Sequence, residues 1–151
     1  RRHASALARF LSGAGAGPGE VEDLAQEAFF KAFRGLDSWR KESSFRSWLF
    51  SIASNLRKDV YRRGRGRVVL SIEDHDLPDG RDPASELVAD ETARRIQAGL
   101  AKLPRLQREV FLLRVQQGLD YGEIAAALGT TAGSARVHYH HAIRTLKELV
   151  P

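Results

Sequence analysis

Residues 43–67 read SSFRSWLFSIASNLRKDVYRRGRGR, and the rest of the chain is organised around this stretch. Its apolar residues recur at three- and four-residue steps, which is the period of a helix with one buried stripe. Ser43 or Ser44 can cap the start of this helix, and Gly64 and Gly66 mark its end. The stripe comprises Phe45, Trp48, Leu49, Ile52, Ala53, Leu56 and Val60.

The other side of this predicted helix is polar and runs into a cluster of arginines. A surface of this kind suits a polyanion, because each cation that neutralises a phosphate releases condensed counterions. The alternative is an ordinary helix face whose cations are solvated. The polar side carries Asn55, Lys58, Asp59 and Arg62, and the cluster consists of Arg62, Arg63, Arg65 and Arg67.

Charge is distributed unevenly along the 151 residues, which carry a formal net charge of +5. Residues 31–67 are strongly basic and residues 71–91 strongly acidic, which points to nucleic acid or an acidic partner. There is no long apolar run and no signal-like segment, so insertion into a membrane is not expected. The absence of cysteine fits a reducing compartment, and we expect a cytoplasmic protein. The chain begins with Arg1, which leaves open whether residues precede it.

The remaining apolar patterns predict further helices and no pair of strands, so the expected fold class is all-α. A short helix over residues 3–11 and a stronger one over residues 20–34 precede the basic helix. Residues 68–72, VVLSI, have no partner strand and are taken as the start of a linker. The helices predicted beyond this linker span residues 84–103, 105–117, 121–128 and 132–150.

The composition divides these helices between two small helical domains. Residues 1–67 are expected to form the first domain, residues 68–83 a flexible acidic linker rich in turn residues, and residues 84–151 the second domain. The first domain is expected to bury Phe29, Phe33, Leu36, Phe45, Trp48 and Leu49 in one core. The first helix of the second domain is expected to turn Leu87, Val88, Ile96, Leu100 and Leu103 inward.

Residues 120–142, DYGEIAAALGTTAGSARVHYHHA, have the pattern of a helix-turn-helix. Gly129 occupies the turn, where a positive φ is expected, and Thr131 is a natural N-cap for the second helix. Outward residues at the front of such a helix point into the major groove of DNA. There Arg136 can bond a guanine edge and Val137 can touch a thymine methyl. A plain pair of packed helices is the alternative.

No catalytic or cofactor-binding pattern stands out in the sequence. The glycine-rich run GAGAGPGE lacks the lysine and hydroxyl residue of a phosphate-binding loop, and it follows no predicted strand. His138 and His141 share a helix face at a three-residue step, but no cysteine and no evident third ligand accompanies them, so a metal site is disfavoured. The sequence therefore predicts neither an enzyme nor a cofactor.

The two patterns together resemble a known family. Residues 23–63, DLAQEAFFKAFRGLDSWRKESSFRSWLFSIASNLRKDVYRR, resemble sigma region 2. Residues 103–146, LPRLQREVFLLRVQQGLDYGEIAAALGTTAGSARVHYHHAIRTL, resemble sigma region 4. Their order and spacing resemble those of the extracytoplasmic-function (ECF) sigma factors, the compact group of the sigma-70 family of RNA polymerase initiation factors. The resemblance implies promoter-specific transcription initiation with core RNA polymerase, and control by an anti-sigma factor.

The resemblance also implies which residues bind which partner. Core RNA polymerase, through its β′ clamp helices, would contact Asp23, Gln26, Glu27 and Phe30, and its β subunit is a further expected partner. The −10 element of promoter DNA would be bound and melted by Ser38, Trp39, Arg40, Lys41, Asn55, Lys58, Asp59, Arg62 and Arg63. The −35 element would be bound by Thr131, Gly133, Ser134, Arg136, Val137, His140, His141 and Arg144. The family usually carries serine and arginine at the positions of Val137 and His141, so the preferred promoter sequence stays open.

A stand-alone helix-turn-helix regulator, whose N-terminal helices dimerise or sense a signal, is the second hypothesis. It predicts tight operator binding by the protein alone, usually as a dimer. A sigma subunit instead predicts weak binding alone and specific binding with core polymerase. Phe45, Trp48 and the polar face around Asn55 favour the sigma subunit.

Overall fold

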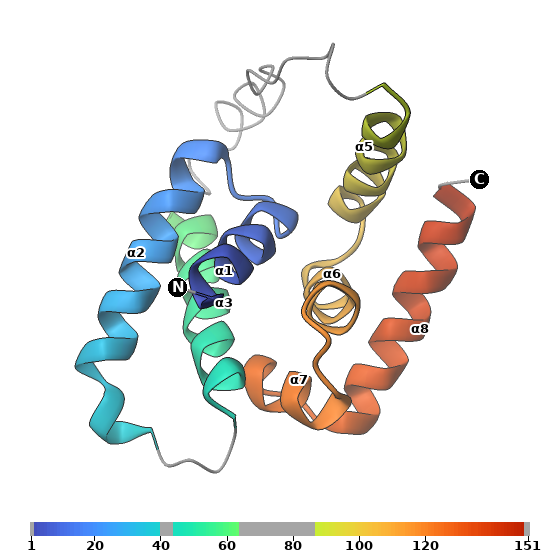
Figure 1. Ribbon diagram of the computed structural model, residues 1–151. Helices are drawn as coiled ribbons and strands as arrows, with labels where there is room; N and C mark the ends of the chain where they lie inside the picture. The colour runs from blue at the N-terminus through green and yellow to red at the C-terminus, as the bar shows by residue number, and fades with distance from the viewer. Residues whose placement is uncertain (1, 40–43, 64–86, 150–151) are drawn as a thin grey trace.

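The computed structural model describes residues 2–39, 44–63 and 87–149, and within these ranges the chain contains helices and no strand (Figure 1). The predicted all-α fold class is confirmed. The expected linker over residues 68–83 lies outside the described residues. The elements are α1 (Arg2–Gly13), α2 (Pro18–Arg34), the 3-10 turn η1 (Leu36–Ser38), α3 (Phe45–Arg63), α5 (Leu87–Ala101), α6 (Arg105–Phe111), the π-helical segment η4 (Leu112–Gln116), α7 (Tyr121–Leu128) and α8 (Ala132–Leu149).

Side-chain caps fix several helix ends where the sequence predicts them. Ser44 Oγ accepts a hydrogen bond from the backbone N–H of Ser47 at 3.1 Å, which starts α3. Thr131 Oγ1 accepts from the N–H of Ser134 at 3.0 Å and starts α8. Gly129 ends α7 with φ +70°, a conformation that glycine adopts without a Cβ penalty. The predicted caps and the predicted turn are therefore confirmed.

Helices α1, α2 and α3 pack together as the N-terminal half of the molecule (residues 2–63). The buried stripe of α2 follows a four-residue step and faces the other two helices. Phe33 lies one position beyond this stripe, about 100° further around the helix, and its side chain is 80% exposed. The prediction that Phe33 and Leu36 are core residues is wrong, because Leu36 is also 46% exposed. The core of this half consists of Leu7, Phe10, Leu11, Ala14, Ala16, Leu24, Ala28, Ala32, Leu49, Phe50, Ala53 and Leu56.

Helices α5 to α8 form the C-terminal half (residues 87–149), with α8 packed against α5, α6 and α7. Leu100 and Leu103 are buried as predicted, whereas Ile96 is 39% exposed and was wrongly placed inward. The described part of α5 lies at the edge of the molecule (Figure 1), so only its C-terminal turn reaches the core. The buried hydrophobic residues here are Leu100, Leu103, Val110, Leu112, Leu113, Leu119, Ile124, Ala127, Ala135, Ala142 and Leu146.

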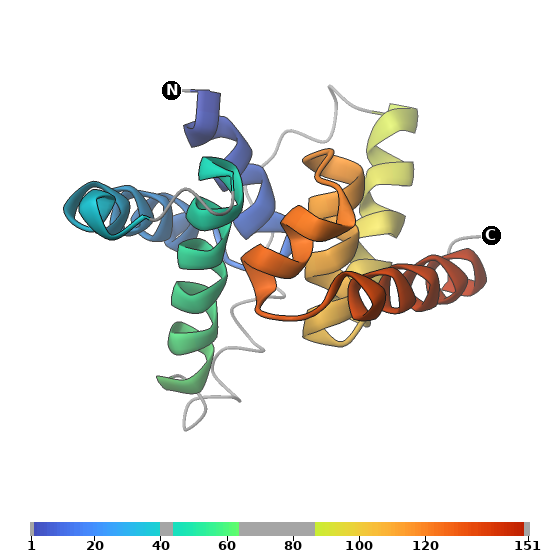
Figure 2. The same ribbon diagram turned by 90° about the horizontal axis from the view of Figure 1, so that it is seen from below.

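The two halves pack against each other along α3. Figures 1 and 2 both place α7 beside α3, and the buried residues of the two halves form one continuous hydrophobic cluster. A Cβ on Gly13, at the end of α1, would approach Leu112 Cδ2 to 2.7 Å, so the helix and η4 are in close contact. Helix α3 therefore has a second buried side, which a single hydrophobic stripe in the sequence does not predict.

Among the helices that the structure describes, none is both long enough and apolar enough to cross a bilayer.

Candidate nucleic-acid and polymerase interfaces

The first turns of α8 present a row of accessible side chains. Arg136, His140 and His141 are exposed, and the side chain of Val137 is 50% exposed. The opposite side of the helix is anchored by the buried residues Ala135 and Ala142. The remaining predicted −35 residues on this helix are also accessible: Thr131, Gly133 and Arg144 are exposed and Ser134 is half-buried.

Tyr121, the first residue of α7, joins two arginines across the helix-turn-helix. The guanidinium carbon of Arg136 lies over its ring, 5.1 Å from the centroid, and that of Arg114 lies over the same ring at 4.6 Å. Arg114 is held in turn by a hydrogen bond from its Nη1 to the carbonyl of Leu119 at 3.1 Å. Cation–π contacts of this kind restrict the rotamers of an exposed arginine. The sequence alone does not reveal Tyr121 and Arg114 as neighbours of Arg136, because their contact depends on how η4, α7 and α8 pack.

The histidines of α8 lie on an accessible helix. No group of three or more candidate ligands (histidine, cysteine, aspartate or glutamate) comes together among the described residues. His140 instead packs against Tyr139, with ring centroids 5.7 Å apart. His138 is half-buried, and its Nδ1 has no hydrogen-bond partner in the described part of the chain.

The polar side of α3 carries the predicted −10 residues. Asn55 is exposed, Lys58 and Asp59 are half-buried, and Arg62 Nη2 donates to Asp59 Oδ1 at 2.9 Å. An exposed ion pair of this kind contributes little to stability, so Arg62 is free to exchange its partner for a phosphate. Arg40, Lys41 and the side chain of Arg63 lie outside the described residues.

Two parts of the predicted −10 site, Ser38 with Trp39 and Asn55 on α3, lie apart from each other. Ser38 Oγ donates to the carbonyl of Gly35 at 2.6 Å, and the ring of Trp39 stacks on Trp48 with centroids 6.1 Å apart. Trp48 precedes Asn55 by seven residues, which is about 10 Å along a helix. The ring of Trp39 therefore packs about two helical turns away from Asn55 along α3.

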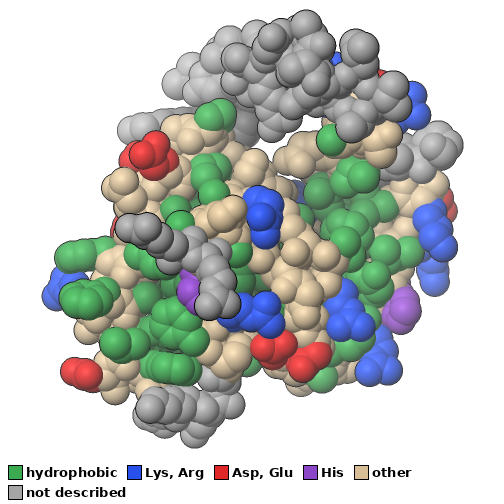
Figure 3. Space-filling model, in the orientation of Figure 1, with side chains coloured by type: hydrophobic (Ala, Val, Ile, Leu, Met, Phe, Trp, Pro, Cys, Tyr) green, Lys and Arg blue, Asp and Glu red, His purple; other side chains and the backbone are tan. Residues whose placement is uncertain are grey.

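The exposed side of α2 carries the predicted polymerase contacts. Asp23, Gln26 and Glu27 are exposed, and Phe30 is 59% exposed with the Arg34 guanidinium 5.4 Å from its ring centroid. Hydrophobic side chains gather along the α2 edge of the molecule in Figure 3. The exposed Phe33 and Leu36 extend this apolar patch towards η1.

An open groove of about 510 Å³ joins this surface to the polar side of α3. Its lining places Glu27 and Lys31 of α2 opposite Asp59 and Arg62 of α3. The structure thus brings one predicted polymerase residue next to two predicted DNA residues.

Two family models match this chain, one on each half. The model described as Sigma-70 region 2 matches residues 1–67, and the model described as Sigma-70, region 4, matches residues 93–146. The chain belongs to the ECF sigma factors. Region 2 of this sigma factor thus contains α1 to α3, and region 4 begins within α5 and contains α6, α7 and most of α8.

Characterised relatives resemble this sigma factor along most of its length. The ECF RNA polymerase sigma factor SigE of Mycolicibacterium smegmatis is 33% identical over 151 residues, which cover 98% of this chain and 58% of that protein. The ECF RNA polymerase sigma-E factor of Escherichia coli is 34% identical over 128 residues, covering 78% and 67% of the two chains. The sigma factor thus spans little more than half the length of the first of these relatives.

A solved structure resembles both halves of the sigma factor together. The sigma factor RpoE of Bartonella quintana, in complex with the anti-sigma factor NepR, superposes with a TM-score of 0.76 at 27% identity. The match covers 97% of this chain and 90% of that one, so it includes the packing of region 2 on region 4.

Proposed function

We propose that this protein is a promoter-recognition subunit that binds core RNA polymerase and directs it to promoters through the −10 and −35 elements. Two accessible surfaces on one chain support this role: the acidic and apolar side of α2 and the row of side chains along α8. The protein has no chemistry of its own and works in the cytoplasm. An anti-sigma factor is a further proposed partner, by analogy with RpoE of Bartonella quintana.

The free-energy cost of promoter opening supports the proposal that this protein opens DNA only together with polymerase. Opening DNA costs about 1.4 kcal/mol per base-pair step in lost stacking. Capturing one unstacked base returns about 1–3 kcal/mol, which offsets the opening of only about one or two steps. A protein of 151 residues therefore needs the much larger contact surface of polymerase to hold a melted region open.

Transcription in vitro with core polymerase tests the proposal. A library of random promoter templates should yield transcripts that share two elements, and the protein alone should bind these templates weakly. Replacing Asp23 and Gln26 together with alanine should weaken core binding at least tenfold, because both side chains belong to the proposed polymerase surface of α2. Both are exposed, so their loss should not disturb packing. Pull-down of core polymerase measures this effect, and circular dichroism should show unchanged helix content.

The matched control replaces Glu91 and Arg95 together with alanine. These residues form an exposed ion pair on α5, which is far from α2 along the chain. This control should bind core polymerase as the parent does. Tight operator binding by the protein alone, with no effect of core polymerase, would instead support the stand-alone regulator.

A second prediction concerns base reading by Arg136. Arg136→Ala should cost about 1–3 kcal/mol of binding to the −35 element and relax the preference at one base pair. Tyr121→Ala should relax the preference at the same base pair, because the arginine loses the ring that restricts its rotamers. Tyr121→Phe keeps the ring and should behave as the parent. A loss of equal size on all DNA sequences would mean that Arg136 contacts phosphate and reads no base.

A further inference from the structure

Helix α8 carries two exposed histidines among its exposed arginines. His140 follows Arg136 by four residues and precedes Arg144 by four, so the three side chains lie on one side of the helix, one turn apart. His141 stands beside this row, four residues after Val137. All five residues are exposed. A row of permanently charged arginines is thus interrupted by groups whose charge ordinarily changes between about pH 5 and 8.

His140 is held within a cluster of aromatic rings. Its imidazole lies edge-on to the ring of Tyr139, with centroids 5.7 Å apart and planes at 65°. Tyr139 in turn lies edge-on to Tyr121, with centroids 6.2 Å apart. The Tyr121 ring also carries the guanidinium groups of Arg136 and Arg114. His140 therefore belongs to a group of rings that two cations already border.

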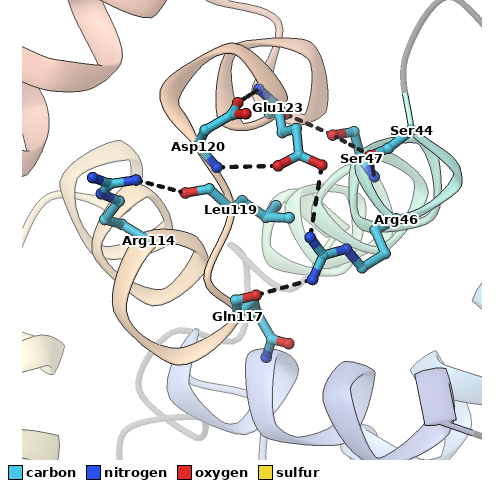
Figure 4. A network of polar contacts seen from close by, with 8 residues as sticks. All are labelled: Ser44, Arg46, Ser47, Arg114, Gln117, Leu119, Asp120 and Glu123. Atoms are coloured by element: carbon cyan, nitrogen blue, oxygen red, sulfur yellow. Dashed lines mark hydrogen bonds and ion pairs between the residues drawn. The ribbon is translucent and has the colours of Figure 1, made fainter.

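The described carboxylates of the helices that pack against α8 have other partners. These helices are α5, α6 and α7. Their carboxylates are bonded within or between the helices, as Figure 4 shows for α7: Glu91 with Arg95, Glu109 with Ser54 and Arg105, and Glu123 with Arg46 and the N–H of Asp120. On α8 itself, Glu148 lies about two turns beyond His141. No ion pair joins His140 or His141 to a carboxylate in the part of the chain that the structure describes.

The cations of the same helices are also engaged away from the two histidines. Arg108 of α6 donates to the carbonyls of Leu100 and Leu103, and Arg114 of η4 donates to the carbonyl of Leu119. The charge on His140 and His141 is therefore left to solvent and to whatever binds the exposed side of α8.

The position of the histidines along α8 favours contact with phosphate. The helix begins at Ala132, and both histidines lie about 6 Å or more beyond Arg136 along its axis. In a helix-turn-helix the N-terminal residues of the recognition helix contact base edges, and residues further along such a helix reach the DNA backbone. Contacts to phosphate and sugar are also at least half of all protein–DNA hydrogen bonds.

The two protonation states of imidazole differ in what they offer to a phosphate. A neutral imidazole has one N–H donor, whereas the protonated ring has two donors and a positive charge. Only the charged ring replaces a condensed counterion, and its hydrogen bond to a phosphate oxygen is the stronger one. A phosphate beside the ring therefore favours uptake of a proton from solvent.

We propose that His140 and His141 bind phosphates of the −35 duplex in their protonated form, so that this protein takes up protons when it engages the element and binds it more tightly at lower pH. This inference rests on the proposed function. The sign follows from linkage, because protons that favour the complex are in turn bound more tightly in the complex. Arg136 and Arg144 keep their charge throughout this range, so binding should weaken at high pH and persist.

Binding at two pH values and several salt concentrations tests the proposal. The probe is a duplex that carries the −35 element recovered from the random library and lacks the −10 element, bound by the protein with core polymerase and followed by fluorescence anisotropy. At a fixed salt concentration the parent should bind about tenfold more tightly at pH 6 than at pH 8. The slope of log K against log salt should be steeper at pH 6 by about 0.9 for each histidine that holds a phosphate.

Two double variants fix the charge of the pair. His140→Gln with His141→Gln is neutral at every pH and should bind at pH 6 about as weakly as the parent does at pH 8. His140→Arg with His141→Arg is always charged and should bind at pH 8 about as tightly as the parent does at pH 6. Both positions are exposed, so circular dichroism should show unchanged helix content. A pH effect that arises in polymerase is common to all of these proteins and cancels in the comparison.

Single replacements of other histidines are the matched controls. His138 is half-buried on the same helix, and the ring of His3 packs on Phe45 in region 2, with centroids 5.4 Å apart. His138→Gln and His3→Gln should each keep the pH dependence of the parent. Loss of this dependence in either control, with helix content intact, would place the titrating group elsewhere and overturn the proposal.

Calorimetry counts the protons directly. The full chain is titrated with the same duplex at low salt and pH 7.5, in two buffers that differ in their heat of ionisation. An ordinary imidazole is only about one-tenth charged at this pH, so the parent should take up about one to two protons and the double glutamine variant almost none. A parent that prefers one −35 element, with a salt slope independent of pH and no proton uptake, would overturn this inference alone. A parent that prefers no −35 element at either pH would overturn the proposed function.

Discussion

Asn55→Ala should abolish promoter opening while leaving the fold and polymerase binding intact. Asn55 is exposed on α3, and surface substitutions usually change the free energy of unfolding by less than about 0.5 kcal/mol. A neutral amide is poorly suited to hold phosphate, but it offers two donors and an acceptor to the edge of an unpaired base. The expected defect is loss of the open complex, measured by permanganate reactivity of unpaired thymines.

Two controls separate base capture from general weakening of DNA binding. A template that is already mismatched across the bubble should restore part of the activity of Asn55→Ala, because the cost of unpairing has been removed. Arg62→Ala, on the same helix, should instead weaken binding about equally on all sequences and reduce its salt dependence, as loss of a phosphate contact does. An Asn55→Ala protein that opens promoters as the parent does would refute a role for Asn55 in melting.

Glu109→Ala should lower the free energy of unfolding by about 2–3 kcal/mol, the largest stability effect that we expect from a single polar substitution in this chain. The carboxylate is 1% exposed and accepts from Ser54 at 2.6 Å and from Arg105 at 3.1 Å. Removing it leaves the buried Ser54 hydroxyl without its acceptor and creates a cavity. The side chain of Arg105 is 40% exposed and can turn to water, so the cost stays below that of breaking a fully buried ion pair.

Denaturation by urea measures this loss of stability, and two further variants define its origin. Glu109→Gln keeps an oxygen that accepts from Ser54 and should cost only about 1 kcal/mol. Ser54→Ala should cost about the same, and the combined loss in the double variant should be less than additive because the two residues share one bond. A Glu109→Ala protein with the stability of the parent would show that the bond between Ser54 and Glu109 does not stabilise the folded protein.

Local patterns in the sequence predicted much of the fold. The apolar period of residues 45–60 predicted α3, Ser44 and Thr131 predicted helix starts, and Gly129 predicted the left-handed turn of the helix-turn-helix. Each of these features depends on residues within a few positions of one another, so the sequence contains all of the necessary information.

Burial was predicted less well, because it depends on where neighbouring helices stop. Phe33 is large and apolar but lies outside the side of α2 that faces α1 and α3, and Leu36 lies beyond the end of α2, in η1. Ile96 has the right helical spacing on α5, but the other helices contact mainly the C-terminal turn of that helix, where Leu100 is buried. The spacing of residues along one helix predicts the direction in which a side chain points. It does not predict how far a neighbouring helix extends, and so it does not predict whether that side chain is covered.

By itself, the sequence determined the helices, the helix-turn-helix and the pairing of a sigma region 2 with a sigma region 4. Only the tertiary structure decided that the two regions share one cluster of buried residues, and that Ser47, Ser54 and Glu109 are buried and bond between the regions. Serine and glutamate are ordinarily surface residues, so their types give no sign of burial. They are buried here because α3 is covered on a second side by α6 and α7, and residues more than fifty positions apart supply the bonds that make this burial possible.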